Sequence, residues 1–237
     1  MARPLISTKL LIPKVRRQVV TRPRLLDRLR RATEVRLTLV SAPAGFGKTT
    51  LLAAWLGGME EDRRRIAWVS LDAADSDPAS FWTYVVSALQ AAVPGVGPSA
   101  FELIAPSDLP IESVLTMVLN DLAMAPADVW LVLDDYHLVD SHDVAKGMVF
   151  LLDHLPSHGH VVISTRADPG LPLPRWRVRG ELAELRAAEL RFTSKEATAY
   201  LNDVAGLDLS AVDVEALEQR TEGWVAALQL AALSKKS

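Results

Sequence analysis

The apolar residues of the chain follow two patterns that alternate along it. Four short runs are largely apolar and a fifth, with two glutamates in five residues, is a plausible strand, whereas the stretches between them carry apolar side chains every three or four residues. The short runs are residues 37–40, 66–71, 129–133, 160–166 and 181–185. Such runs predict strands buried on both faces, and the longer period predicts helices, for example at 78–93 and 111–125. Strands that alternate with helices predict an α/β domain with a parallel sheet.

From Thr193 onward the pattern predicts helices only. Thr193 and Glu196 form a capping box for a helix through about residue 204, Ser210 begins another helix, and Gly223 separates a third. We therefore expect two domains, 1–190 and 191–237, the second small and all-helical. The last helix is apolar on nearly every face, which predicts that it is buried or awaits a partner, and its position at the end of the chain suggests a fragment of a longer protein.

The first apolar run leads into the segment Ala-Pro-Ala-Gly-Phe-Gly-Lys-Thr-Thr, which precedes a helical stretch. A strand, a glycine-bearing loop and a helix in this order bring unpaired N–H groups to one point and predict a phosphate site. Gly45 and Gly47 let the backbone wrap the phosphates, Lys48 supplies a charge for them, and Thr49 offers a hydroxyl to Mg²⁺. Ala42 replaces the first glycine of the usual pattern. The predicted nucleotide ligands of this loop are Ala44, Gly45, Phe46, Gly47, Lys48, Thr49 and Thr50.

Polar residues end two other predicted strands. The run at 129–133 is followed by Asp134 and Asp135, a Walker B pattern, and parallel strands would bring these acids to the sheet edge where the phosphate loop opens. Asp134, with Thr49, is the predicted Mg²⁺ ligand, and Asp135 is the predicted base that polarises water. Arg166 ends the fourth strand, where it either reaches a γ phosphate or is only a surface charge.

The composition of the chain limits the compartment and the partners that we expect for this protein. The chain has no cysteine, which excludes disulfides and fits a reducing compartment, and it lacks an apolar stretch long enough to span a membrane, so we expect a cytoplasmic protein. Residues 1–36 carry a net charge of +9 and the rest carry −12. A basic arm could touch nucleic acid or phosphates, but a solvated amphipathic segment is the favoured interpretation because the rest of the chain would repel DNA.

The five histidines all lie between His137 and His160. A metal site there is rejected because Pro156 and Gly159 break the helical spacing that would bring His154 and His158 together.

Several motifs together resemble the MalT-like, large ATP-binding LuxR-type transcriptional regulators, over essentially the whole chain. The matching residues are Thr8-Lys9-Leu10, the phosphate loop at 42–50, Trp68-Val69-Ser70-Leu71-Asp72, Leu133-Asp134-Asp135-Tyr136-His137, Ser164-Thr165-Arg166, the segment 184–192 and Thr221-Glu222-Gly223-Trp224. This family begins its phosphate loop with Ala-Pro-Ala-Gly, so Ala42 agrees with the resemblance.

The resemblance implies a STAND-class, NB-ARC-like P-loop NTPase, a three-layer sandwich with a five-stranded parallel sheet in the order 5-1-4-3-2. It implies that Arg166 senses the γ phosphate, that Val20 and Arg22 lie against the adenine, and that Gly223 and Trp224 close over the base. In such proteins a winged helix, a repeat sensor and a helix-turn-helix follow, so DNA binding would lie outside this chain.

These features together predict a regulatory switch that binds ATP or ADP with Mg²⁺, hydrolyses ATP slowly and controls downstream domains of the same regulator. Turnover as an enzyme and self-association in the ATP form are left open. One alternative is a P-loop kinase or motor ATPase, although the candidate basic lid, Arg175, Arg177 and Arg179, lies close to the fifth strand. Another is a module that holds ADP permanently.

Overall fold

The computed structural model describes residues 5–15, 19–57, 65–104 and 110–236. Parts of the basic segment 1–36 lie outside these residues. Five strands make one sheet: β1 (Leu37–Ser41), β2 (Arg65–Ser70), β3 (Val129–Asp134), β4 (Gly159–Thr165) and β5 (Leu182–Arg186). All neighbouring strands are parallel, in the order β2-β3-β4-β1-β5. This is the predicted order 5-1-4-3-2 seen from the other edge, so the predicted fold class is confirmed.

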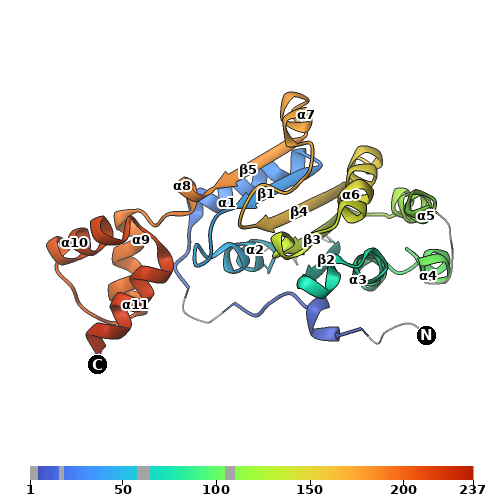
Figure 1. The fold of residues 1–237 in the computed structure, drawn as a ribbon. Coiled ribbons are helices and arrows are strands. Elements are labelled where there is room, and N and C mark those ends of the chain that lie inside the picture. The colour runs from blue at the N-terminus through green and yellow to red at the C-terminus, as the bar shows by residue number, and fades with distance from the viewer. Residues whose placement is uncertain (1–4, 16–18, 58–64, 105–109, 237) are drawn as a thin grey trace.

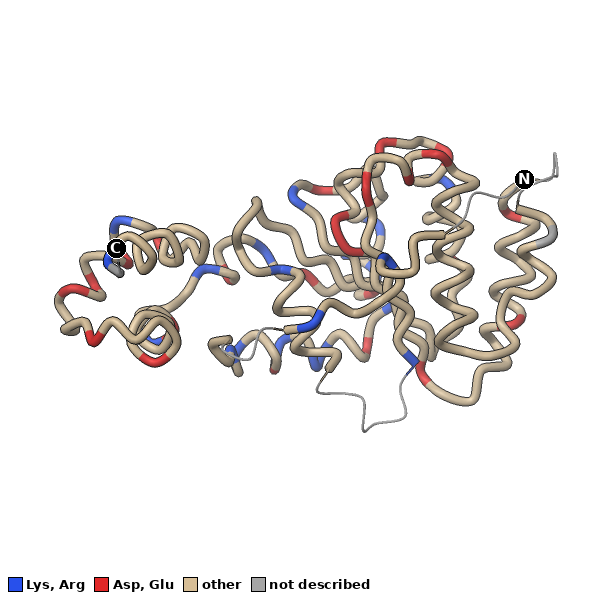
Figure 2. Tube along the Cα trace, turned by 90° about the horizontal axis from the view of Figure 1, so that it is seen from below, with Lys and Arg blue, Asp and Glu red and all other residues tan. Residues whose placement is uncertain are grey.

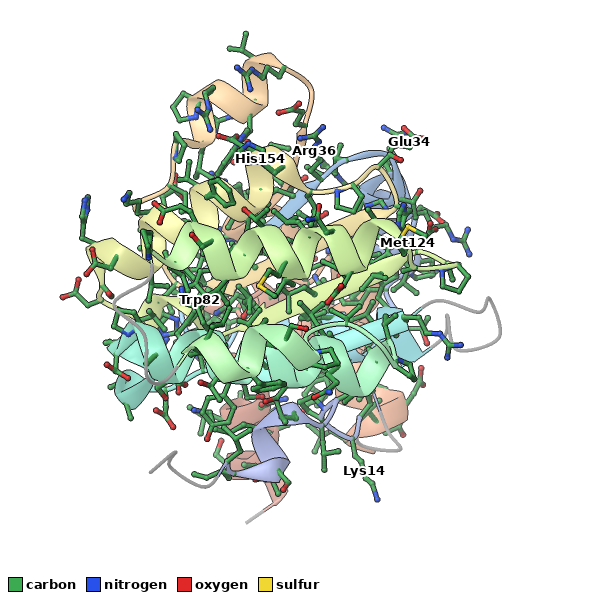
Figure 3. All side chains as sticks on the ribbon, turned by 90° about the vertical axis from the view of Figure 1, so that its right-hand side faces the viewer. Lys14, Glu34, Arg36, Trp82, Met124 and His154 are labelled. Atoms are coloured by element: carbon green, nitrogen blue, oxygen red, sulfur yellow. The ribbon has the colours of Figure 1, made fainter. Side chains whose placement is uncertain are left out.

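Two helical layers cover the sheet because alternate strand residues point to opposite faces. One face packs on α3 (Pro78–Ala92), α5 (Ile111–Ala123) and α6 (His142–His154), and the other on α1 (Pro23–Arg30) and α2 (Lys48–Gly57) (Figure 1). Leu39 faces the first layer, whereas its neighbour Val40 faces the second. Trp82 lies inside the first layer, and Lys14 points away from the body of the molecule (Figure 3). Gly147 of α6 leaves the room that this indole fills, because a Cβ there would lie 2.5 Å from the Trp82 ring.

The predicted strands are all present, and the helix predicted at 78–93 begins where expected, at Pro78. The periodicity did not predict four helices: α4 (Pro98–Ile104), α6, α7 (Leu173–Val178) and α8 (Ala187–Leu190). Short 3-10 turns complete this part of the chain: η1 (Ser7–Leu10), η2 (Arg31–Glu34), η4 (Ala73–Ser76) and η5 (Tyr136–Leu138). Three of the missed helices have eight residues or fewer, which is too short for a clear helical period.

Residues 191–236 form a helical unit at one end of the molecule (Figure 1). It contains α9 (Ser194–Thr198), which continues as a π-helical segment, η6 (Ala199–Val204), and then α10 (Ala211–Thr221) and α11 (Val225–Lys236). Thr193 and Glu196 form the predicted capping box, and Ser210 caps α10. The unit has its own apolar cluster, in which Leu228 of α11 is fully buried, whereas Leu230 of the same helix is 65% exposed.

Basic and acidic residues are interspersed along the described trace (Figure 2). The arginines of α1 and of the segment before it pair with acids of the same chain: Arg24 with Glu196, Arg28 with Glu189 and Arg30 with Asp27. Arg28 and Arg30 nevertheless stay more than half exposed, while Leu25 and Leu29 of the same helix are buried, so α1 has the solvated, amphipathic character of the favoured interpretation.

Candidate nucleotide site

The phosphate loop connects β1 to α2, as predicted, and its conformation suits an anion. Gly45 and Gly47 have φ values of +79° and +74°, which a side chain would strain. The Lys48 ammonium lies inside the loop, where it donates to the carbonyls of Ala42 (2.8 Å) and Pro43 (3.1 Å). The pKa of Lys48 is lowered overall, mainly because the ammonium is buried. The positive charge of Arg166 lowers this pKa further, whereas the carboxylates of Asp135 and Asp134 raise it. A phosphate would compete with the two carbonyls for this ammonium and would remove the penalty of burying it.

Asp134 lies at the end of β3 in a buried network of hydroxyl groups. The Thr49 hydroxyl donates to the two carboxylate oxygens at 3.1 and 2.9 Å, and the Ser164 hydroxyl also donates to this carboxylate. Burial raises the pKa of Asp134 overall, although the bonds from Ser164 and Thr49 act in the opposite direction. The hydroxyl of Thr49 and the carboxylate of Asp134 are oxygen ligands of the kind that Mg²⁺ prefers, so the donor set fits the predicted metal.

Ser164 is a site residue that the sequence reasoning missed. It lies in a motif that was quoted for the resemblance, but only Arg166 in that motif received a role. The Ser164 hydroxyl accepts the N–H of Asp135 at 3.1 Å while it donates to Asp134, so one side chain orients both acids. β4 lies beside β3 in the sheet, and this adjacency brings Ser164 to the two acids.

Asp135 and Arg166 are less enclosed than Asp134. Asp135 has a left-handed backbone (φ 59°), a strained conformation for a residue other than glycine, and its side chain is 41% exposed. Arg166 follows β4 directly and is exposed. Its charge acts on Lys48 and on His137, so these groups share one edge of the sheet.

The helical unit touches the phosphate loop. The Trp224 indole N–H donates to the carbonyl of Ala44 at 3.1 Å, and the N–H of Ala226 donates to the carbonyl of Gly45 at 3.1 Å. A Cβ at Gly45 would lie 2.5 Å from the Cβ of Ala226, so this close approach needs a glycine there. The structure thus brings Trp224 to the predicted loop residues, through the backbone of the loop.

Arg22 and Val20 lie at the junction between the sheet and the helical unit. The Arg22 side chain is 7% exposed, donates to the carbonyls of Leu190 and Arg191 at 2.8 and 2.9 Å, and stacks on the ring of Phe192. Val20 packs against the apolar cluster of the helical unit. Their predicted adenine contact stays a prediction.

Gly223 lies at the same junction. Its carbonyl accepts the N–H of Phe192 at 2.8 Å, and a Cβ at this position would lie 2.5 Å from the Phe192 carbonyl oxygen. Its φ of +69° also favours glycine. The contacts of Gly223 with Phe192 hold the turn between α10 and α11 against the junction. The predicted contact of Gly223 with the base stays a prediction.

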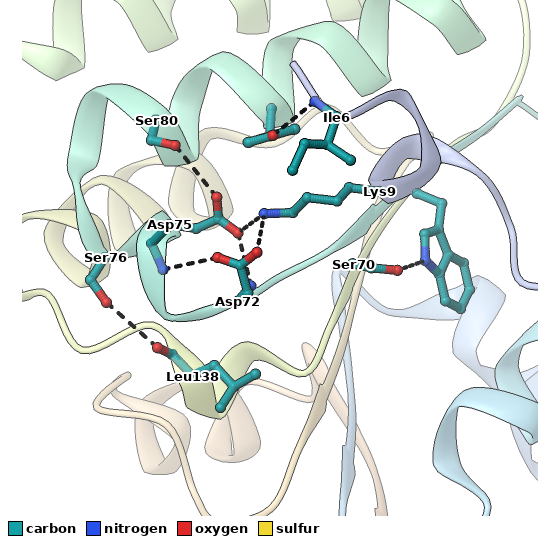
Figure 4. A network of polar contacts seen from close by, with 11 residues as sticks. Ile6, Lys9, Ser70, Asp72, Asp75, Ser76, Ser80 and Leu138 are labelled. Atoms are coloured by element: carbon teal, nitrogen blue, oxygen red, sulfur yellow. Dashed lines mark hydrogen bonds and ion pairs between the residues drawn. The ribbon is translucent and has the colours of Figure 1, made fainter. Parts of the chain in front are cut away.

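A second polar network, also missed by the sequence reasoning, joins two of the quoted motifs (Figure 4). The Lys9 ammonium contacts Asp75, which is 1% exposed, and Asp72 at 3.2 Å, and it lies 4.3 Å from the centre of the Tyr84 ring. Asp72 and Asp75 also cap the turn η4, whose Ser76 accepts the N–H of Asp140 at 3.0 Å. The network therefore fastens the N-terminal segment to the loop beside the Walker B acids.

The other residues that suggested chemistry have structural partners. His158 bonds to the carbonyl of Leu122 and His160 to that of Val35, both at 2.9 Å. Arg175 and Arg177, candidates for a kinase lid, pair with Asp153 and Glu184. Within the described ranges, we find no group of three or more His, Cys, Asp or Glu residues arranged around a metal position. No described helix has the length and apolarity needed to cross a membrane.

Comparison with known proteins finds relatives that share this segment. The chain is 37% identical over 217 residues to the serine/threonine-protein kinase PknK of Mycobacterium tuberculosis, which covers 91% of the chain and 20% of that protein. It is 35% identical over 234 residues to the HTH-type transcriptional regulator MalT of Cronobacter sakazakii and 33% identical over 229 residues to MalT of Vibrio cholerae. These matches cover 98% and 96% of the chain and 25% of each regulator. The chain thus spans between a fifth and a quarter of the length of these relatives. No family model matches the chain.

Solved structures agree on the fold. The STAND protein PH0952 of Pyrococcus horikoshii, which has a tetratricopeptide repeat sensor, matches with a TM-score of 0.60 and 14% identity, over 92% of this chain and 30% of its own. Cdc6p of Pyrobaculum aerophilum matches with a TM-score of 0.55 and 16% identity, over 84% of this chain and 53% of its own. The replication initiator DnaA, bound to AMPPCP and single-stranded DNA, matches with a TM-score of 0.52 and 15% identity, over 89% of this chain and 59% of its own.

Proposed function

The chain is a homologue of the MalT transcriptional regulators and has the fold of a STAND-class P-loop ATPase, and from that premise we propose that it is an ATP- and ADP-binding regulatory switch. The nucleotide with Mg²⁺ would bind between a P-loop domain, residues 1–190, and a helical domain, residues 191–237. The angle between the domains would differ between the ATP and ADP forms. The switch would act in the cytoplasm on further domains of the same regulator, and any DNA contact would belong to those domains.

The residues of this chain divide the work by position. Lys48 would hold the β and γ phosphates, and the loop N–H groups would bind their oxygens. Thr49 and Asp134 would hold Mg²⁺, which neutralises phosphate charge when bound. Asp135 would accept a proton from the attacking water, and Arg166 would bind a γ-phosphate oxygen. Hydrolysis would be slow and would reset the switch.

The observation that carries the proposal is the contact of Trp224 and Ala226 with the phosphate loop. A ligand shifts an equilibrium only through different contacts in the two states. Trp224 and Ala226 bind the carbonyls of Ala44 and Gly45, which belong to the residues that would wrap the phosphates. A change in the loop conformation would therefore change the contact between the loop and the helical unit. The occurrence of a homologous segment both in a kinase and in transcriptional regulators also supports a module that reports to different outputs.

The direct test is to denature the purified protein and to identify any released nucleotide by chromatography. Lys48→Ala is the variant, and Lys14→Ala, at an exposed lysine, is the control. We expect ADP or ATP from the wild type and the control, or an empty protein that takes up ATP with Mg²⁺, and neither from Lys48→Ala. A wild-type protein that releases no nucleotide and binds none would refute the proposal.

Two alternatives are separated by one further measurement, the exchange of bound ADP for labelled nucleotide. A module that holds ADP permanently would not exchange it, and a turnover enzyme would exchange and hydrolyse many equivalents without a partner. The ion pairs of Arg175 and Arg177 speak against the use of these residues as a mobile kinase lid.

A further inference from the structure

The solvent-exposed face of α1 carries a cavity that the proposed nucleotide site does not use. Its volume is about 490 Å³, which lies within the range of pockets that hold small molecules. Its described lining is charged throughout and consists of Arg24, Asp27, Arg28 and Arg31. None of these residues belongs to the phosphate loop or to the Walker B strand, so the cavity is separate from the site described above.

The spacing of the three arginines concentrates positive charge on one face of the helix. Arg24, Arg28 and Arg31 are four and three positions apart, a spacing that stacks side chains one above the other. Leu25 and Leu29 point to the opposite side and are buried. Like charges at this spacing destabilise a helix, and an anion held between them would remove that repulsion.

Arg24 is a fixed wall of the cavity. Its Nε and Nη2 atoms donate to the carboxylate of Glu196 at 2.9 and 2.8 Å. Its Nη1 atom donates to the carbonyl of Glu189 at 2.6 Å, and Nη2 also donates to the carbonyl of Arg191 at 2.7 Å. Because these bonds occupy nearly all of its donors, Arg24 shapes the cavity and leaves the binding of a ligand to its neighbours.

Arg28 and Arg31 have donors to offer. The Arg28 side chain is 56% exposed, and one of its terminal nitrogens contacts Glu189. Arg31 is exposed and has no ion pair with any residue that the structure describes. Each guanidinium carries five N–H donors in a planar fork that matches the oxygens of a phosphate. The pair with Glu189 shows that an arginine of this cavity already binds an oxyanion of the chain itself.

Asp27 limits what else the ligand can be. Its side chain is 64% exposed, and its carboxylate pairs with Arg30 at 3.0 Å. A carboxylate repels a bare phosphate but accepts hydrogen bonds from hydroxyl groups. The cavity is also larger than one phosphate needs. This combination suits a molecule with a phosphate at one end and hydroxyl groups beyond it.

We propose that the cavity on α1 binds a small hydroxylated phosphate ester, whose phosphate is held by Arg28 and Arg31 and whose hydroxyl donates to Asp27. Nucleic acid suits the cavity less well, because the described lining has no aromatic side chain on which a base could stack. The chain beyond residue 36 also carries a net charge of −12, which would repel a polyanion. The proposal goes beyond the nucleotide switch and does not depend on it.

The test observes the arginines directly. The Nε–H signals of ¹⁵N-arginine-labelled protein are followed by NMR during titration with glycerol phosphate, and the Arg28 and Arg31 signals are assigned by their loss in Arg28→Gln and Arg31→Gln. Glycerol and inorganic phosphate serve as the two halves of the probe, and sodium chloride at equal ionic strength is the control for screening. We expect both signals to shift to saturation with glycerol phosphate, to respond more weakly to inorganic phosphate, and to stay in place with glycerol and with salt.

Four variants then assign the contacts. Arg28→Gln and Arg31→Gln should each weaken glycerol phosphate about tenfold, the effect of losing one charge-assisted hydrogen bond, as read from the arginine signal that remains. Arg179→Gln, which removes one charge at an exposed arginine after α7, is the matched control and should bind as wild type. Asp27→Ala should lower the preference for glycerol phosphate over inorganic phosphate about fivefold, because it removes the hydroxyl acceptor.

The outcomes keep this site apart from the phosphate loop. Binding that persists in Lys48→Ala and is lost in the Arg28 and Arg31 variants supports the proposal, even for a protein that binds no nucleotide. Binding that is lost in Lys48→Ala and persists in Arg31→Gln would place the phosphate in the loop and overturn it. Signals that move equally with salt would reduce the effect to screening. A face that binds poly-glutamate but not glycerol phosphate would be a docking surface for an acidic protein, which would also refute the proposal.

Discussion

The two sides of the phosphate loop are built differently. On the Walker B side, Asp134 is 3% exposed and receives side-chain hydrogen bonds from Thr49 and Ser164, which neighbouring strands and α2 hold in place. On the helical side, the contact consists of two hydrogen bonds to loop carbonyls, and Trp224 is 40% exposed. Solvent can replace a carbonyl bond near the surface far more easily than a bond inside the core. The Walker B side is thus pre-formed, and the helical side is the one that can open to release a nucleotide.

The largest expected effect is the loss of nucleotide binding on the phosphate side of the comparison. Lys48→Ala removes the only lysine of the loop, and we expect it to abolish stabilisation by nucleotide, which at 100 times Kd would be about 2.7 kcal/mol. Thermal unfolding with and without ATP and Mg²⁺ measures this. Lys14→Ala is the control, and melting shifts that remain unchanged in Lys48→Ala would refute the role of the loop.

The second effect is a destabilised junction between the sheet and the helical unit. In Gly223→Ala the new Cβ would meet the Phe192 carbonyl, and we expect a loss of about 2 kcal/mol in the free energy of unfolding through overpacking. The matched control is Gly180→Ala, because Gly180 has a similar φ of +71° with nothing within 4 Å of the added Cβ. Denaturant unfolding measures both, and equal losses would show that backbone conformation, not the contact with Phe192, is what matters.

A pH effect should appear at the same junction through Glu196. Burial raises the pKa of Glu196, but hydrogen bonds from Arg24 and from the Thr193 N–H, with the charge of Arg22, lower it overall. A carboxyl with a lowered pKa stabilises the fold above its unfolded pKa of about 4.3, and this stabilisation is lost as the pH falls through the lower folded value.

We therefore expect Glu196→Gln to cost about 1.5 kcal/mol at pH 7, and the difference from wild type to shrink as the pH falls below about 4.3. Denaturant unfolding over this range measures it. Glu218→Gln, on α10 near the surface, is the control. A difference that stays constant across the range would remove the ionised form of Glu196 from the explanation.

Arg166→Ala sharpens the comparison on the phosphate side. Because Arg166 would bind only the γ phosphate, we expect the variant to weaken ATP about tenfold, the effect of one charge-assisted hydrogen bond, and to leave ADP affinity nearly unchanged. Titration calorimetry with AMPPCP and with ADP measures the ratio. An equal loss for the two nucleotides would end the sensor assignment.

The smallest effect concerns the displaceable contact. Trp224→Phe keeps the ring and removes the bond to the Ala44 carbonyl, worth about 1 kcal/mol, so ADP release should be about fivefold faster. Stopped-flow release of a fluorescent ADP analogue measures the rate. Leu230→Ala, at an exposed position on α11, the helix that follows Trp224, is the control. Release at the wild-type rate would show that Trp224 does not hold the loop.

The sequence by itself determined the parts that depend on near neighbours in the chain. Four of the five strands follow from largely apolar runs, the phosphate loop from glycines at fixed spacing next to Lys48, and the helix starts at Pro78 and after Thr193 from residues within one turn. The strand order was implied by the family resemblance, and each motif that carried this resemblance can be recognised within a single segment. All of these signals lie within short windows, so no knowledge of distant contacts was needed.

Only the tertiary structure decided which of these segments touch. Ser164 reaches Asp134 across 30 positions, Lys9 reaches Asp75 across 66, and Trp224 reaches Ala44 across 180. The short helices α7 and α8, the arginine-lined cavity on α1 and the commitment of Arg22 to the junction likewise depend on what packs around them. A hydrogen bond between distant residues leaves no periodicity in the chain, because it depends on strand order and packing, and these exist only once the sheet has formed.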